Sequence, residues 1–288
     1  MTPRVLSPEL LGLSSRLRLA SRRRVEGRFA GAHASRRYGS SLDFADYREY
    51  VVGDDPRWVD PNAYARLGRL LVRLFEAEDE AALRLVLDCS ASMGFGGKLD
   101  RGRQAAAALA AIAAAGGDRV RVLLAGPTCD AGPWFRGAAA LPQVEGRLLA
   151  AQPSGVGDLY AAVGRAYGEG PRGPVVLLSD LLVETWADTL RALAAGGGDR
   201  VLVHMLGRAD LEPELDGDVR LADSETGAEV EVGLADEVLE AYRATAARWL
   251  DDVARECGRR GIAYARLIDD EPVDHLLAVT LTGLGVLA

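Results

Sequence analysis

The chain has 288 residues, of which 49% are hydrophobic and 26% charged, a composition typical of a soluble globular protein with a sizeable core. No apolar run approaches about 18 residues, which argues against a transmembrane helix, and the arginine-rich N-terminus lacks the apolar region of a secretory signal. Three widely spaced cysteines, Cys89, Cys129 and Cys257, match no zinc pattern and fit a reducing compartment. We therefore expect a cytoplasmic protein.

Charge is distributed unevenly along the chain. Residues 1–75 hold 14 arginines and 8 acidic residues, a net charge of +6, whereas the remainder carries −14. A basic segment of this kind can bind nucleic acid, an anionic membrane surface or the acidic remainder of its own chain. We predict an arginine-rich arm over residues 1–37, with a short amphipathic helix where Leu10, Leu13 and Leu17 recur at helical spacing.

Residues 38–80 are denser in aromatic and charged side chains. A Gly-Asp-Asp-Pro turn at residues 53–56 precedes an expected helix at 62–68 and an extended run at 70–76. We predict a folded lead-in segment that packs on the main domain.

From residue 81 to residue 288, short apolar runs alternate with helical patterns. The expected strands are residues 82–88, 119–126, 133–135, 173–180, 200–207 and 262–268. The expected helices are residues 100–115, 138–150, 158–167, 186–195, 235–260 and 273–282. A hairpin is expected as an insertion near residues 216–233. This alternation predicts an α/β fold, with a doubly wound, mostly parallel sheet covered by helices on both faces.

Ligands of such folds bind beyond the carboxyl ends of the strands, where two of the expected strands end in aspartate. Asp88 opens the sequence Asp-x-Ser-x-Ser, which adds Ser90 and Ser92, and Asp180 ends a different strand. Two hydroxyls and two carboxylates suit a hard cation such as Mg²⁺, which prefers oxygen ligands. If the two strands are neighbours in the sheet, Asp180 comes near the same ion, directly or through water.

These residues resemble the metal-ion-dependent adhesion site of the von Willebrand factor A family. The resemblance implies a von Willebrand factor A-like domain that binds partners through a divalent cation and is not an enzyme. That family also uses a threonine from a second loop, where this sequence has Gly157. Asp158 could substitute, Ser154 could reach in, or water could fill the gap, so the site is expected to be degenerate.

The lead-in supports a narrower resemblance. The segments Tyr-Arg-Glu-Tyr at 47–50, Gly-Asp-Asp-Pro-Arg-Trp-Val-Asp at 53–60 and Ala-Arg at 65–66 resemble the bacterial family called domain of unknown function 58. Pro61 departs from its pattern, because a tryptophan is expected there. The resemblance implies an adaptor for a MoxR-type AAA+ ATPase, without enzymatic activity.

Charged residues of this lead-in are open to two interpretations. They can form ion-paired networks, since arginine binds carboxylates through two parallel hydrogen bonds, or they can form a docking surface for the partner. The candidate partner-binding residues are Arg48, Asp54, Asp55, Arg57 and Arg66.

Two other classes of function remain as alternatives. A metal-assisted hydrolase would use Asp88 and Asp180 with Asp158 as the base, and a binder of nucleic acid or anionic surfaces would act through the arginine arm. The glycines before Lys98 lack the spacing of a phosphate-binding loop, and His204 lies in an apolar strand as a core histidine would. The sequence therefore favours a non-enzymatic protein-interaction module.

Overall fold

The computed structural model describes residues 4–20, 44–75, 82–137, 139–168, 173–213, 217–234 and 236–288. They group into two units: residues 4–20 and 82–288 belong to the larger, and residues 44–75 to the smaller. The predicted domain boundary after residue 37 therefore differs from the structure, in which the N-terminal helix belongs to the larger unit. The rest of the predicted arginine-rich arm, residues 21–37, lies outside the described residues.

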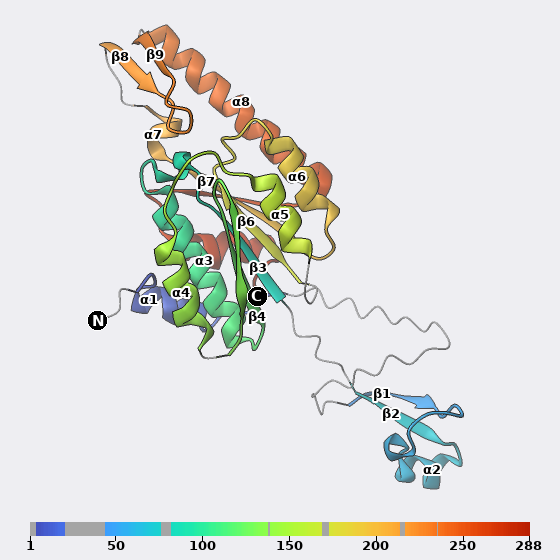
Figure 1. The fold of residues 1–288 in the computed structure, drawn as a ribbon. Coiled ribbons are helices and arrows are strands. Elements are labelled where there is room, and N and C mark those ends of the chain that lie inside the picture. Colours follow the sequence, from blue (N-terminus) through green and yellow to red (C-terminus); the bar gives the residue numbers. More distant parts are fainter. Residues whose placement is uncertain are drawn as a thin grey trace. The chain divides into compact units, whose positions relative to one another are not determined.

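A six-stranded sheet forms the centre of the larger unit (Figure 1). Its strands, in spatial order, are β10 (Ala263–Ile268), β7 (Arg200–Leu206), β6 (Val175–Ser179), β3 (Ala82–Asp88), β4 (Arg119–Ala125) and β5 (Cys129–Phe135). All neighbours pair in parallel except β5, which runs antiparallel to β4 at the edge. The predicted α/β class with a mostly parallel sheet is confirmed. Strand order reverses between β3 and β6, and such a switch point opens a crevice for ligands.

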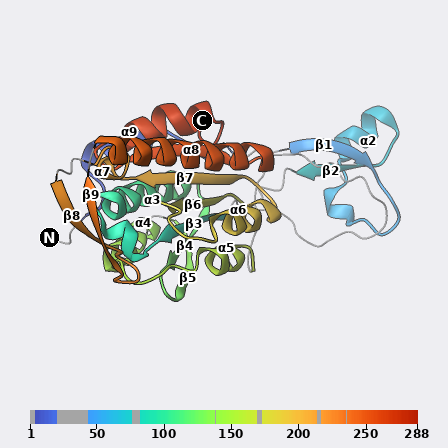
Figure 2. The same ribbon diagram turned by 90° about the horizontal axis from the view of Figure 1, so that it is seen from above.

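Helices cover both faces of this sheet (Figures 1 and 2). One face carries α1 (Pro8–Ser14), α3 (Lys98–Ala115), α4 (Ala140–Ala150) and α9 (Val273–His275). The other face carries α5 (Leu159–Gly168), α6 (Trp186–Ala195) and α8 (Asp236–Arg260). Leu85 and Leu87 of β3 point into the first layer and Val86 into the second, as the alternation of side chains along a strand requires.

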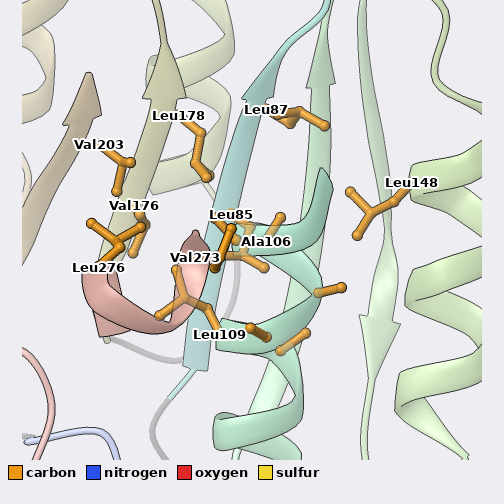
Figure 3. Close-up of a cluster of buried hydrophobic side chains, with 14 of the residues drawn as sticks. Leu85, Leu87, Ala106, Leu109, Leu148, Val176, Leu178, Val203, Val273 and Leu276 are labelled. Atoms are coloured by element: carbon orange, nitrogen blue, oxygen red, sulfur yellow. The ribbon is translucent and has the colours of Figure 1, made fainter. Parts of the chain in front are cut away.

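The first layer is held by close packing of α3 on the sheet (Figure 3). Leu85, Ala106 and Leu109 are fully buried there. Small residues let the helix approach closely: a Cβ added at Gly102 would lie 2.9 Å from Leu87 Cδ1. Each buried leucine contributes on the order of 2 kcal/mol through removal of apolar surface from water.

The N-terminal helix α1 is tied to this layer by polar and apolar contacts. Glu145 Oε1 accepts hydrogen bonds from the backbone N–H groups of Val5 (3.1 Å) and Leu6 (3.2 Å). Leu6 is buried in the same apolar cluster as α3, and Leu19 forms an antiparallel bridge with Leu287. The segment around Leu19 therefore lies beside the C-terminal residues in the larger unit.

Several expected elements differ in extent from the observed ones. The predicted hairpin is present as β8 (Gly217–Ala222) and β9 (Glu229–Leu234), after the short helix α7 (Arg208–Leu211). The predicted helix at 273–282 is instead α9 followed by a π-helical segment, η3 (Leu276–Leu281). None of the helices in the described parts of the chain is long and apolar enough to cross a membrane.

The smaller unit is an antiparallel pair of strands with two short helices. β1 (Phe44–Glu49) pairs with β2 (Leu71–Phe75), and η1 (Pro56–Trp58) and α2 (Pro61–Leu67) lie between them in the chain. Asp60 caps α2 by accepting hydrogen bonds from the N–H groups of Asn62 (2.8 Å) and Ala63 (3.2 Å). Its carboxylate also accepts from the Tyr47 hydroxyl at 2.6 Å and from Arg73 at 2.9 Å. These hydrogen bonds, the one from Tyr47 first, hold the pKa of Asp60 well below its ordinary value.

Replacing Asp60 by alanine is expected to loosen the smaller unit, because one carboxylate joins β1, β2 and the start of α2. Amide hydrogens of α2 should exchange about tenfold faster, as loss of a helix cap predicts. Hydrogen exchange followed by mass spectrometry measures this. Glu49→Ala is the control, since the Glu49 side chain forms an exposed ion pair with Arg69. Equal protection of α2 in both variants would contradict this role of Asp60.

Candidate functional site

The carboxyl ends of β3 and β6 are joined by polar side chains at the switch point. Asp88, the last residue of β3, is fully buried. Its Oδ1 accepts a hydrogen bond from the Ser90 N–H at 2.9 Å, and its Oδ2 accepts from the Ser179 hydroxyl at 2.6 Å. Because Ser179 is the last residue of β6, Asp88 both shapes its own loop and links the two central strands.

Both serines of the Asp-x-Ser-x-Ser sequence point toward this junction. The hydroxyls of Ser90 and Ser92 lie 2.9 Å apart, and Ser92 Oγ donates to Asp180 Oδ1 at 3.4 Å. Ser90 is fully buried, and Ser92 is 8% exposed. The structure therefore brings together all four residues predicted to face a cation, Asp88, Ser90, Ser92 and Asp180.

A fifth member of the cluster is Lys98, at the start of α3. Its Nζ lies 2.8 Å from Asp180 Oδ2 and 3.0 Å from Asp210 Oδ2, and its side chain is 1% exposed. Sequence reasoning assigned Lys98 no role beyond a weak likeness to a phosphate loop. One signal was available: Lys98 is the sole lysine among 34 basic residues. A compact ammonium fits a buried site between two carboxylates where the larger guanidinium of arginine would not.

Burial and neighbouring charges shift the pKa of Asp88 in the same direction, but they oppose each other at Lys98. Burial, together with the charge of Asp180, raises the pKa of Asp88 to about 7. Burial alone would lower the pKa of Lys98, but the charges and hydrogen bonds of Asp180 and Asp210 outweigh it and raise that pKa. Lys98 therefore remains an ammonium, and it balances only part of the negative charge at this edge of the sheet.

The second loop, residues 153–158, lies against the same cluster. A Cβ added at Gly157 would lie 3.2 Å from Asp88 Oδ1 and 3.3 Å from Ser90 Cβ, so the position expected for the missing threonine does face the site. Asp158, one of the candidates to replace it, has a local partner. Its Oδ1 accepts from the Ala161 N–H at 2.9 Å and caps α5. Ser154 is exposed, and among the described residues no hydrogen bond joins its side chain to the cluster.

Comparison of the sequence with known protein families identifies a match. Residues 46–250 match the family described as "Protein of unknown function DUF58". The chain belongs to the DUF58 family. The predicted resemblance to this family is thereby confirmed.

Relatives of this DUF58 protein include "Uncharacterized protein Rv1480" of Mycobacterium tuberculosis and "Uncharacterized protein Mb1516" of Mycobacterium bovis. Each is 31% identical over 266 residues, which covers 86% of this chain and 81% of the relative. Among solved structures, it is similar to the conserved hypothetical protein BatB from Bacteroides thetaiotaomicron (TM-score 0.44, 14% identity). It is also similar to an aerotolerance-related membrane protein from Bacteroides fragilis (TM-score 0.43, 16% identity). Both alignments cover 71% of this chain and 98% of the other, and both likenesses are too distant to bear on function.

The loop that carries Asp180 in this DUF58 protein is held in an unusual conformation. Leu181 is fully buried with a φ of 53°, a left-handed conformation that is unfavourable for a residue with a branched side chain. The Leu181 N–H donates to Ser179 Oγ at 2.9 Å, and the Leu182 N–H donates to Asp180 Oδ1 at 3.2 Å. The first bond holds the loop, and the second orients the Asp180 carboxylate.

His204 supports the same loop from β7. Its Nε2 lies 3.0 Å from the Asp180 carbonyl oxygen, and its Nδ1 lies 3.0 Å from the Tyr264 hydroxyl. Burial lowers the pKa of His204 to about 4, so the ring is neutral at pH 7 and donates one of these two bonds. The prediction of a core histidine is confirmed.

An apolar cavity of about 240 Å³ adjoins the cluster on the α8 side. Its walls include Asp180, Leu182, Asp210, Tyr242 and Trp249. Within the described residues, no group of three or more His, Cys, Asp or Glu side chains is arranged to hold a metal. Any cation at this site would therefore need the serine hydroxyls among its ligands.

Candidate partner-binding residues of the smaller unit mostly pair with one another. Arg48 donates two hydrogen bonds of 2.9 Å to Asp54, and Arg57 binds Asp55 at 2.6 Å. Arg66 lies in the last turn of α2, without an ion pair among the described residues. The predicted ion pairing is thus observed for two pairs, while docking of a partner on these residues remains a prediction.

Proposed function

We propose that this DUF58 protein is a non-enzymatic protein-interaction module that holds a divalent cation, Mg²⁺ in the first instance, at the cluster of Asp88, Ser90, Ser92 and Asp180. One observation carries the proposal. Two serine hydroxyls, 2.9 Å apart, lie at the junction of β3, which ends with Asp88, and β6, which is followed directly by Asp180. A carboxylate from the partner would complete the coordination of the ion.

The donor set fits a hard cation. Lys98 holds Oδ2 of Asp180, whereas Oδ1 faces Ser92. Mg²⁺ keeps several of its waters and tolerates few direct protein ligands, so the serines would bind it directly and the carboxylates would act directly or through water. Because Gly157 has no side chain to contribute, coordination positions would be left for water and for the partner.

The polar contacts favour this proposal over a metal-assisted hydrolase. Such an enzyme needs a base beside the cation-bound water. Asp158, the expected base, is committed to the N-terminus of α5, and both ring nitrogens of His204 have partners.

The proposed partner is a MoxR-type AAA+ ATPase, for which the chain would act as an adaptor. This choice rests on the family resemblance of the sequence. The apolar cavity between Leu182 and Trp249 adjoins the proposed cation and offers room for an apolar side chain next to the partner's carboxylate.

Titration with Mg²⁺ or Mn²⁺, followed by calorimetry, tests the cation. Ser92→Ala removes a hydroxyl ligand and is expected to weaken binding at least about tenfold. Asp158→Asn is the matched control because Asp158 caps α5 outside the cluster, and its affinity should equal that of the wild type. Equal heats for wild type and Ser92→Ala would remove the cation from the proposal. Binding of the ATPase should then be compared in Mg²⁺ and in a chelator.

A further inference from the structure

The hairpin inserted between α7 and α8 brings its tip to the proposed cation site. Ser92 of the cluster and the neighbouring Leu182 line one hollow together with the hairpin. The hairpin residues of this hollow are Leu221, Ala222, Asp223, Ser224, Glu225, Ala228, Glu229 and Val230. In Figure 1 the hairpin stands at the end of the sheet where α7 follows β7.

The tip of the hairpin has a defined conformation. Asp223 Oδ1 accepts from the N–H groups of Glu225 (2.7 Å) and Thr226 (3.0 Å). The Gly227 N–H donates to the Asp223 carbonyl at 2.8 Å, with a φ of 72° that favours glycine. Glu225 is thus presented by a closed turn, so little backbone entropy is lost when it binds a ligand.

The Glu225 carboxyl group is partly buried at this tip. Its Oε1 is buried and has no hydrogen-bond partner among the described residues. Burial raises the pKa of this carboxyl group, the nearby Ser92 hydroxyl lowers it in part, and the charge of Asp180 raises it further. In the described parts of the chain it forms no ion pair, and Lys98 is already shared between Asp180 and Asp210. A buried carboxylate oxygen without a partner is costly, and a cation bound by Ser92 would satisfy it.

We infer that Glu225 is a further ligand of the cation at Ser90 and Ser92, and that it takes in cis the coordination position otherwise open to a partner's carboxylate. The inference rests on the proposed function. Gly157 leaves its position in the second loop without a ligand, because it has no side chain. The hairpin would supply an oxygen ligand through the hollow that Glu225 shares with Ser92, and a partner must displace it.

Binding of Mn²⁺ to the full chain, measured by calorimetry, tests this inference. Glu225→Gln is expected to weaken Mn²⁺ binding at least about tenfold, as loss of a metal-site residue typically does. Glu231→Gln is the matched control, because Glu231 lies on the same hairpin in an exposed pair with Arg220. Hydrogen exchange gives a second readout: Mn²⁺ should protect the amides of residues 223–228 in wild type but not in Glu225→Gln.

The possible outcomes separate the two proposals. If wild type and Ser92→Ala both fail to bind Mn²⁺, the cation site itself is wrong. A second outcome is that wild type binds Mn²⁺ and Ser92→Ala does not. If Glu225→Gln then binds Mn²⁺ as tightly as wild type, and Mn²⁺ protects its amides at residues 223–228 as in wild type, only the role of Glu225 is overturned. Weakening by Glu225→Gln and not by Glu231→Gln supports the inference.

Discussion

Replacing Lys98 by methionine is expected to destabilise the protein by about 3–5 kcal/mol in the absence of divalent cations. Methionine retains most of the volume of the side chain but leaves Asp180, which is 2% exposed, without its cation. Breaking a buried ion pair by removing one partner carries a penalty of this order. Urea unfolding in a chelator, monitored by tryptophan fluorescence, measures the change.

A control variant and a double variant test whether this loss of stability comes from the unpaired charge of Asp180. Arg243→Met removes an exposed cation from α8 and should change stability by less than about 0.5 kcal/mol. Adding Asp180→Asn to Lys98→Met should restore part of the loss, because the double variant no longer buries an unpaired charge. A loss below about 1 kcal/mol for Lys98→Met would show that the ammonium does not hold this edge of the sheet.

Lys98 also connects stability to the proposed cation. If Mg²⁺ and the ammonium both neutralise Asp180, the ion should stabilise Lys98→Met more than it stabilises the wild type. Equal stabilisation of the two proteins would place the ion away from Asp180. The sole lysine of the chain would then have a structural role alone.

The sequence predicted the central part of the site because its residues occupy the ends of strands. Asp88 and Asp180 each follow a short apolar run, and parallel strands bring their carboxyl ends to one edge. The sequence did not specify that β3 and β6 are neighbours, which is decided by the order of the sheet. Local pattern also predicted the helices well, although η3 is a π-helical segment that no periodicity indicated.

Residues that reach the site from distant parts of the chain were not predictable in the same way. Lys98 pairs with Asp180, which is 82 residues away in the sequence. Glu225 belongs to an inserted hairpin and does not follow an apolar strand, so no sequence pattern pointed to it. Asp158 is a different case, because it lies next to Gly157 in the sequence. In the structure, its carboxylate accepts a backbone N–H at the N-terminus of α5, a local helix cap that the sequence position alone does not distinguish from a contact with the cluster.

In a chelator, two buried groups are expected to give this protein opposing pH dependences between about pH 4 and pH 7. The pKa of His204 is lowered to about 4 in the fold, below its unfolded value near 6.5, so its contribution to stability is lost as the pH falls through this range. The pKa of Asp88 is raised to about 7 from 3.8, so its contribution is lost as the pH rises. Each contribution is on the order of 3 kcal/mol across this range, and the two oppose each other.

Single variants should separate these two contributions. Asp88→Asn leaves the histidine, so stability should fall by about 3 kcal/mol from pH 7 to pH 4, whereas His204→Gln leaves the aspartate and should give the reverse slope. Urea unfolding at pH 4, 5.5 and 7 measures both, and parallel profiles for the two variants would refute the assignment. Mg²⁺ should reverse the slope of His204→Gln, because a cation at the cluster stabilises the ionised form of Asp88 and displaces its proton. The same unfolding measurements, made with and without Mg²⁺, therefore test whether the proposed cation binds beside the Asp88 carboxylate, independently of any partner.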